Sequence, residues 1–164
     1  MPQHFPNPFP PEHAAHKLYE TLTTQRDGDS PLVPKRVYRA ETTGAINAAP
    51  DLSYNIVALL HLLNDDLDAA HVLVQAHEDD MTANYVHQIV HRREGDLSNT
   101  RYWVAKTGNH PHYVELAPLV SPHGLAAWDA NQVVTWATRG EHFVAGLNDA
   151  ETQSLLTWCV RTGA

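Results

Sequence analysis

Between positions 53 and 106 the pattern of apolar and polar residues occurs twice. Writing Leu59–Ala76 (LLHLLNDDLDAAHVLVQA) above Ile89–Lys106 (IVHRREGDLSNTRYWVAK) aligns Asp66 with Asp96, thirty residues later. Apolar residues occupy the same positions almost throughout, and each aspartate precedes a leucine as an N-cap precedes the first turn of a helix. The pattern therefore predicts a duplicated unit of two antiparallel helices joined by a tight turn.

This duplication sets the expected architecture. We expect the first unit to contain helices over 53–64 and 67–78, and the second over 82–94 and 97–106. Helical pairs of this kind are typical of solenoids, in which each pair buries its apolar stripe against the next. Two units are fewer than such arrays usually need, so flanking helices must cap the ends. The predicted fold is all-α, a short solenoid-like array of antiparallel helix pairs with capping helices.

The rest of the chain completes a single domain spanning 1–164. Residues 1–11 carry five prolines and predict an extended arm. Residues 12–25 predict a helix, whereas 26–50 predict mostly loop with a short extended piece at 35–40. Residues 107–164 predict the capping helices: a short one over 113–120, one from Asp129 to Ala137, and a final one from Asn148 or Asp149 to Val160.

Composition narrows the possible partners and location. The 164 residues are 43% apolar and 18% charged, which is typical of a globular domain. A net charge of −8 argues against a general nucleic-acid surface or a surface for anionic membranes. The single Cys159 cannot form an internal disulfide, and no segment resembles a signal peptide or a membrane span. We therefore expect a cytoplasmic protein.

Histidine is unusually frequent. Protonation of all twelve histidines would change the formal charge from −8 to −8 + 12 = +4. Stability and partner choice could therefore change between about pH 7 and pH 5.

The repeated segment also resembles known proteins. Its helical pairs look like tetratricopeptide-type or Sel1-type repeats, although the diagnostic Trp, Gly, Tyr and Pro positions are incomplete and the period is shorter. LNDDLDAAH followed by HRREGDLSNTRYW resembles a family of small, functionally uncharacterised fungal and bacterial proteins with His-Arg-Arg-Glu-Gly-Asp, then Asn and Tyr-Trp, at this spacing. The resemblance covers roughly residues 53–110, and more weakly Trp128-Asp129. It implies a shared fold and site and names no reaction.

Helical phase places several polar residues together. At about 100° per residue, His87, His91 and Glu94 share one face of their helix. The repeat aligns His91 with His61 and Glu94 with Asn64 on the preceding unit. First helices of solenoid units line a common surface, so we expect these five residues, His61, Asn64, His87, His91 and Glu94, to face one groove, where Asn64 could contact substrate.

Three interpretations of this groove remain open. Imidazoles at i and i+4, a carboxylate one turn further and the imidazole of His61 are suitable ligands for Zn²⁺ or a similar divalent cation, with a position left for water. The same cluster, His61, His87, His91 and Glu94, could act without metal, with a histidine as general base. It could also be an ordinary solvated polar face. His-x-x-x-His occurs often by chance, and the adjacent Glu of the protease signature is absent.

The two arginines of the motif differ in expected role. Arg93 falls on the apolar side, where a charge needs a partner, and we expect it to tie two turns together through Asp66 or Asp96. Arg92 lies nearer the polar side and could contact an acidic substrate.

Other residues of the repeat are interpreted mainly as structural. His71 lies on the polar face of its helix, so we expect a surface role for it unless loops fold over it. For His77 we expect a core position in which the ring nitrogens have hydrogen-bond partners. Trp103 replaces Leu73 of the first unit and should pack. Tyr102 is similar, with a hydroxyl that needs a partner and could contact substrate.

Two function classes follow. The first is a small-molecule enzyme, hydrolytic or acid-base and possibly metal-assisted, which uses the histidine–glutamate cluster. The second is a non-catalytic peptide- or protein-binding module, which the repeat resemblance would imply. The imidazoles favour the enzyme. The sequence contains no phosphate loop, dinucleotide fingerprint or Gly-x-Ser-x-Gly motif.

Overall fold

The computed structural model describes residues 5–164, and this part of the chain forms helices without strands. It confirms the predicted all-α class. The helices are α1 (Ala14–Thr23), α2 (Thr43–Ala48), α3 (Tyr54–Leu63), α4 (Leu67–Gln75), α5 (Met81–Glu94), α6 (Leu97–Thr107), α7 (Ala117–Val120), α8 (Ala130–Arg139) and α9 (Val144–Thr162), with short 3-10 turns at Ala40–Thr42, Pro111–Glu115 and Ser121–His123.

The duplicated helix pairs are present as α3–α4 and α5–α6. Asp66 and Asp96 are the N-caps of α4 and α6 and have nearly the same backbone angles, φ −89°, ψ 74° and φ −88°, ψ 77°. Their carboxylates accept the backbone N–H groups of Ala69 and Asn99, at 3.3 and 3.1 Å. The two copies therefore begin their second helices with the same capping geometry.

The turn before each cap is also repeated. Asp65 in the first unit and Gly95 in the second have positive φ values of 58° and 79°. The residue that follows donates its backbone N–H to the carbonyl oxygen of His61 in the first unit and of His91 in the second, at 2.9 Å in both. A left-handed residue at this position ends the first helix and reverses the chain.

Arg93 ties the turn between α3 and α4 to the loop that follows α1. Its buried guanidinium pairs with Asp65 at 2.6 Å and donates to the carbonyl oxygens of Leu62 and Pro31. The prediction that Arg93 pairs with Asp66 or Asp96 is wrong, because the carboxylates of these two residues cap α4 and α6.

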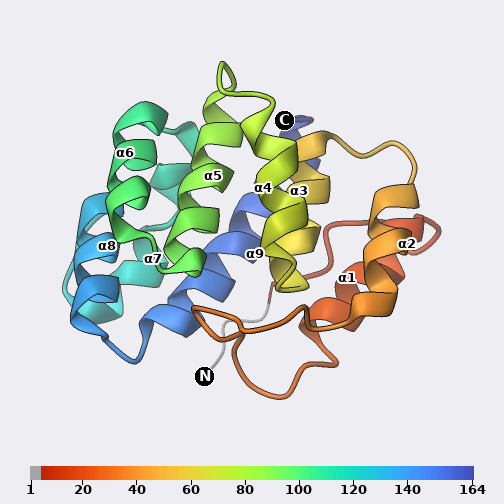
Figure 1. The fold of residues 1–164 in the computed structure, drawn as a ribbon, viewed down its shortest axis with the longest axis horizontal. Coiled ribbons are helices and arrows are strands. Elements are labelled where there is room, and N and C mark those ends of the chain that lie inside the picture. The colour runs from red at the N-terminus through yellow and green to blue at the C-terminus, as the bar shows by residue number, and fades with distance from the viewer. Residues whose placement is uncertain (1–4) are drawn as a thin grey trace.

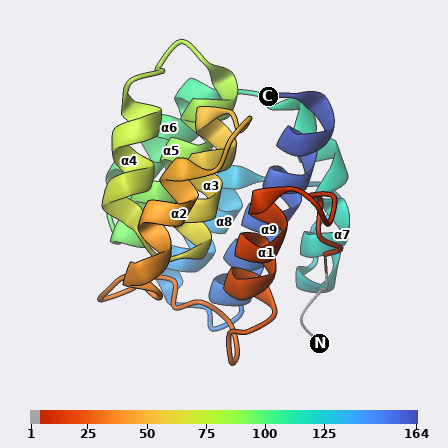
Figure 2. The same cartoon turned by 90° about the vertical axis from the view of Figure 1, so that its right-hand side faces the viewer.

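The helices α6, α5 and α4 lie side by side across the face seen in Figure 1, with α9 behind them. Contacts of α5 with both α4 and α6, and of α9 with α3, hold this arrangement. The view in Figure 2 shows α1 in front of α9, where the hydroxyl of Tyr19 donates to Gln153 at 3.1 Å. Among the C-terminal helices, α8 contacts α6 and α9 contacts α3, whereas α7 contacts α9.

The last helix begins earlier than predicted. The sequence predicts Asn148 or Asp149 as its N-cap, but α9 begins at Val144. Asn148 is instead buried inside the helix, where its side-chain oxygen accepts a hydrogen bond from Arg92 at 3.1 Å. Asp149 accepts the backbone N–H of Ser30 at 2.6 Å. Both polar side chains are thus used for tertiary contacts and not for capping.

The segment 26–50 contains a helix that the pattern did not predict. The structure has no strand at 35–40, and α2 occupies Thr43–Ala48. Ile46 is fully buried and Asn47 contacts the ring of His61 at 2.8 Å, so tertiary contacts hold a helix too short to show a periodic pattern.

The proline-rich arm packs against α1 over the residues that the structure describes. Phe9 is buried, and the side-chain amide of Asn7 donates to the carbonyl oxygen of His16 at 2.9 Å. Residues 1–4 of the predicted arm lie outside the described residues. None of the helices within 5–164 has the length and apolar content needed to cross a membrane.

Candidate metal centre

Three histidines from two adjacent helices meet on the face formed by α4, α5 and α6. His71 lies on α4, while His87 and His91 lie one turn apart on α5. One ring nitrogen from each can be chosen so that all three lie within 4.8 Å of one another. The Nε2 atoms of His71 and His87 are 3.0 Å apart.

Aromatic stacking holds two of the three rings in place. The ring of His87 stacks on Trp103 of α6 with centroids 3.7 Å apart. It is also nearly parallel to the ring of His91, whose centroid lies 4.9 Å away at an interplanar angle of 12°. His71 stands nearly perpendicular to both histidine rings, at 67° and 78°. Lys106 lies over the Trp103 ring at 4.6 Å. The donor atoms are therefore positioned before any ligand binds.

Glu94 contacts the two outer histidines from the end of α5. Its Oε1 accepts a hydrogen bond from Nδ1 of His71 at 3.0 Å, and its Oε2 lies 3.0 Å from Nδ1 of His91. A proton held on Nδ1 leaves Nε2 with a free lone pair. The carboxylate therefore favours the tautomer in which His71 offers Nε2 to a ligand, and its negative charge also lies beside Nδ1 of His91.

Burial favours the neutral form of His87 and of His91. It lowers the pKa of His87 to about 3, with further lowering from His71, His91 and Lys106. It also lowers the pKa of His91, although Glu94 acts in the opposite direction. Neutral imidazole is the form that binds metal ions.

The donor set fits a borderline divalent cation. Zinc–nitrogen bonds of about 2.0–2.1 Å at tetrahedral angles put two ligand nitrogens about 3.3 Å apart. The 3.0 Å between the Nε2 atoms of His71 and His87 is close to that value. Three imidazoles without a thiolate suit zinc, copper or nickel better than magnesium or calcium, which prefer oxygen ligands.

His61 does not join this group, which corrects the expected common groove. Its fully buried ring contacts Asn47 of α2 at 2.8 Å through Nε2 and lies 3.7 Å from Asp66 through Nδ1. His61 does occupy the position that corresponds to His91. However, α2 covers it, and it is not among the grouped nitrogens. The predicted catalytic or metal-binding role for His61 is therefore abandoned.

Asn64 is likewise occupied by the fold. It is fully buried, its Oδ1 accepts the backbone N–H of Arg39 at 2.9 Å, and its side-chain amide donates to the carbonyl oxygen of the same residue at 3.0 Å. Both ends of the amide are used, so the predicted substrate contact has no free group.

The expected position of Arg92 is also wrong. Its side chain is fully buried and forms an ion pair with Glu151 of α9, whose other oxygen accepts from the hydroxyl of Tyr85 at 3.0 Å. A charge buried this way needs its partner and cannot reach a ligand at the surface. Tyr102, by contrast, is 57% exposed and lies edge-on to Trp103 at 5.3 Å, so its predicted contact with substrate remains a prediction.

The sequence interpretation missed His71 as a member of the site. The wheel placed it correctly on the polar side of its helix, but its counterpart in the repeat is Arg101, so the alignment gave no second histidine there. The signal that could have found it is the packing of α4 beside α5, which turns part of that polar side toward His87 and His91.

Comparison of the chain with protein-family models, with curated proteins and with solved structures gives no match. The site's geometry is therefore the basis for a functional proposal.

Proposed function

We propose that this protein is a metal-dependent hydrolase of small molecules, with a zinc-like ion held by His71, His87 and His91. The convergence of three ring nitrogens within 4.8 Å is the observation that carries the proposal. Zinc bound by three protein ligands keeps a fourth position for water, whose pKa it lowers to about 7.

The neighbouring residues have supporting roles in this proposal. Glu94 accepts the Nδ1 proton of His71, as carboxylates commonly do behind metal-bound histidines, and its other oxygen lies 3.0 Å from Nδ1 of His91. Trp103 fixes the ring of His87. Lys106, beside Trp103, adds a positive charge near the histidines, although its ammonium also pairs with Glu78.

A substrate would approach from the open side of the helical layer. The side chains of His71 and Glu94 are 26% and 28% exposed, and that of His91 is 9% exposed. None of these residues lines either of the two cavities described in this structure. This open position also favours a second candidate, a peptide-binding module in which the histidines contact an extended partner.

Two broader expectations belong to the same proposal. The segment HRREGDLSNTRYW resembles the fungal and bacterial family. We propose the same site in members that have a histidine and a glutamate at the positions of His91 and Glu94. A cytoplasmic location is proposed because Cys159 is the chain's lone cysteine and cannot form an internal disulfide of the kind common in secreted proteins.

Hydrolysis of p-nitrophenyl acetate and bis(p-nitrophenyl) phosphate tests the reaction. The zinc-loaded protein should hydrolyse at least one of them, chelator treatment should abolish the activity, and zinc should restore it. His71→Ala should lose the activity, whereas His142→Ala, which removes an exposed histidine outside the group, should keep it. Activity that chelation leaves unchanged would favour the metal-free acid-base site. Metal binding with no hydrolysis of either ester would contradict the enzyme proposal.

A further inference from the structure

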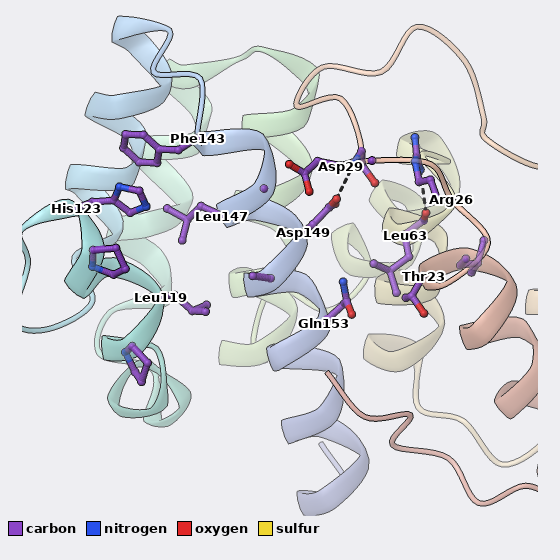
Figure 3. Close-up of a pocket in the computed structure, with 17 residues that line it drawn as sticks. Thr23, Arg26, Asp29, Leu63, Leu119, His123, Phe143, Leu147, Asp149 and Gln153 are labelled. Atoms are coloured by element: carbon purple, nitrogen blue, oxygen red, sulfur yellow. Dashed lines mark hydrogen bonds between the residues drawn. The ribbon is translucent and has the colours of Figure 1, made fainter. Parts of the chain in front are cut away.

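A cleft of about 610 Å³ lies beside α9, bounded by the segment 117–123 and by the loop after α1 (Figure 3). Its lining contains no residue of the histidine group. Cavities of this size are typical of small-molecule sites. It is therefore a separate candidate site and does not depend on the proposed hydrolase.

One end of the cleft carries two carboxylates, Asp29 and Asp149, and one guanidinium, Arg26. Arg26 is already paired with Asp65 at 2.5 Å and lies over the ring of Tyr38 at 4.3 Å. Asp149 accepts the backbone N–H of Ser30.

Asp29, in contrast, has no hydrogen-bond or ion-pair partner within residues 5–164. Arg93 also pairs with Asp65, so two guanidinium groups face three carboxylates, Asp29, Asp65 and Asp149. The local balance is one negative charge.

Gly146 brings the carboxylate of Asp29 against α9. A Cβ atom at position 146 would lie 2.9 Å from Oδ2 of Asp29, closer than real Cβ contacts allow. A glycine inside a helix costs about 1 kcal/mol relative to alanine. Here it leaves room for the carboxylate of Asp29 at the wall of the cleft.

The opposite side of the cleft is apolar and aromatic. His123 stacks on Phe143 with centroids 3.7 Å apart and an interplanar angle of 9°, and Leu119 and Leu147 line the cleft beside them. Figure 3 shows this group on the side away from Asp29 and Asp149. A carboxylate end and an aromatic end thus face the same space.

We propose that this cleft binds a small organic cation, an amine that carries an aromatic or apolar group. Its ammonium contacts Asp29 and its ring packs near Phe143 and His123. An anion of the same shape would meet the excess of carboxylates at the polar end. Burial raises the pKa of Asp149, and a bound cation would offset that effect.

Titration calorimetry at pH 7.5 with phenethylamine, and with phenylacetate as its anionic counterpart, tests the proposal. The protein should bind phenethylamine saturably and phenylacetate at least about tenfold more weakly, as expected for one charge-assisted contact. Asp29→Asn should weaken amine binding about tenfold or more. Asp27→Asn, the same charge change at an exposed residue outside the cleft, should leave it unchanged.

Gly146→Ala provides a variant whose fold should be retained, since alanine favours the helix. It should weaken amine binding less than Asp29→Asn does, because its Cβ shifts the carboxylate of the exposed Asp29 side chain but leaves the charge in place. The proposal is overturned if the amine does not bind saturably, if phenylacetate binds as well, or if Asp29→Asn has no more effect than Asp27→Asn.

Discussion

Nδ1 of His71 donates a hydrogen bond to Oε1 of Glu94 across 3.0 Å, although the two residues are 23 positions apart and lie on different helices. The same carboxylate contacts His91 from its own helix. Glu94 thus links the histidine of α4 to the pair on α5. The arrangement leads to several expected outcomes.

Replacing the carboxylate should weaken metal binding without unfolding the chain. Glu94→Gln removes the negative charge beside Nδ1 of His71 and of His91 and one of the two acceptor oxygens, and we expect zinc affinity to fall about 10- to 100-fold. Competition with a chromogenic chelator measures the change. Glu20→Gln is the matched control, because Glu20 contacts His16 at 3.2 Å outside the site. Equal affinity of Glu94→Gln and wild type would contradict the assigned role.

Trp103 should report on the site optically. Its ring lies 3.7 Å from that of His87, so a Cu²⁺ ion on the histidines should quench its fluorescence at short range. Titration of the wild type with Cu²⁺ should quench one component saturably. In Trp103→Phe that component should be missing while the other three tryptophans still emit. Quenching that persists unchanged in Trp103→Phe would place the bound copper elsewhere.

Acid should destabilise the metal-free protein before most carboxylates titrate. Burial lowers the pKa of His110 and of His112 to about 4, and that of His87 to about 3. The unfolded histidines titrate near pH 6.5, so below that pH the unfolded state binds more protons. The stability is fully present above about pH 6.5 and is lost as the pH falls toward the folded values.

Urea denaturation at pH 7.5, 6.0 and 5.0 measures this dependence. Each histidine can contribute up to about 1.4 kcal/mol per pH unit inside the window. Asp149 and Glu151 act in the opposite sense, because burial raises their pKa, and offset part of the loss. Equal or greater stability at pH 5.0 than at pH 7.5 would contradict the inferred neutral histidines.

The buried pair of Arg92 and Glu151 should matter for folding and not for ligand binding. Glu151→Leu leaves the arginine charge unpaired, and we expect a loss of about 3–5 kcal/mol in the free energy of unfolding. The double variant Arg92→Leu/Glu151→Leu should recover most of it, because no buried charge remains. Chemical denaturation of both variants tests this, and a single variant within about 1 kcal/mol of wild type would argue against the structural role.

Local patterns sufficed to predict much of the fold. The positions of the four repeat helices follow from apolar spacing and from Asp66 and Asp96, whose capping role depends on neighbours a few residues away, although α4 ends at Gln75 and not at residue 78. The shared face of His87, His91 and Glu94 follows from helical phase in the same way.

Tertiary contacts decided the rest. Arg92 is buried against Glu151, which lies 59 positions further along the chain. A local pattern of apolar and polar residues carries no information about so distant a partner. His71 joins the site through the packing of α4 on α5, whereas α2 covers the corresponding His61. Equivalent positions in a duplicated sequence thus acquired different neighbours.

The central claim is that His71, His87 and His91 bind one divalent ion together. Mass-spectrometric metal analysis of protein equilibrated with limiting zinc and then desalted tests it most directly, with His71→Ala and His142→Ala beside the wild type. The account predicts about one zinc per chain in the wild type and in His142→Ala, and almost none in folded His71→Ala. Zinc absent from the wild type, or retained by His71→Ala at the wild-type level, would contradict it.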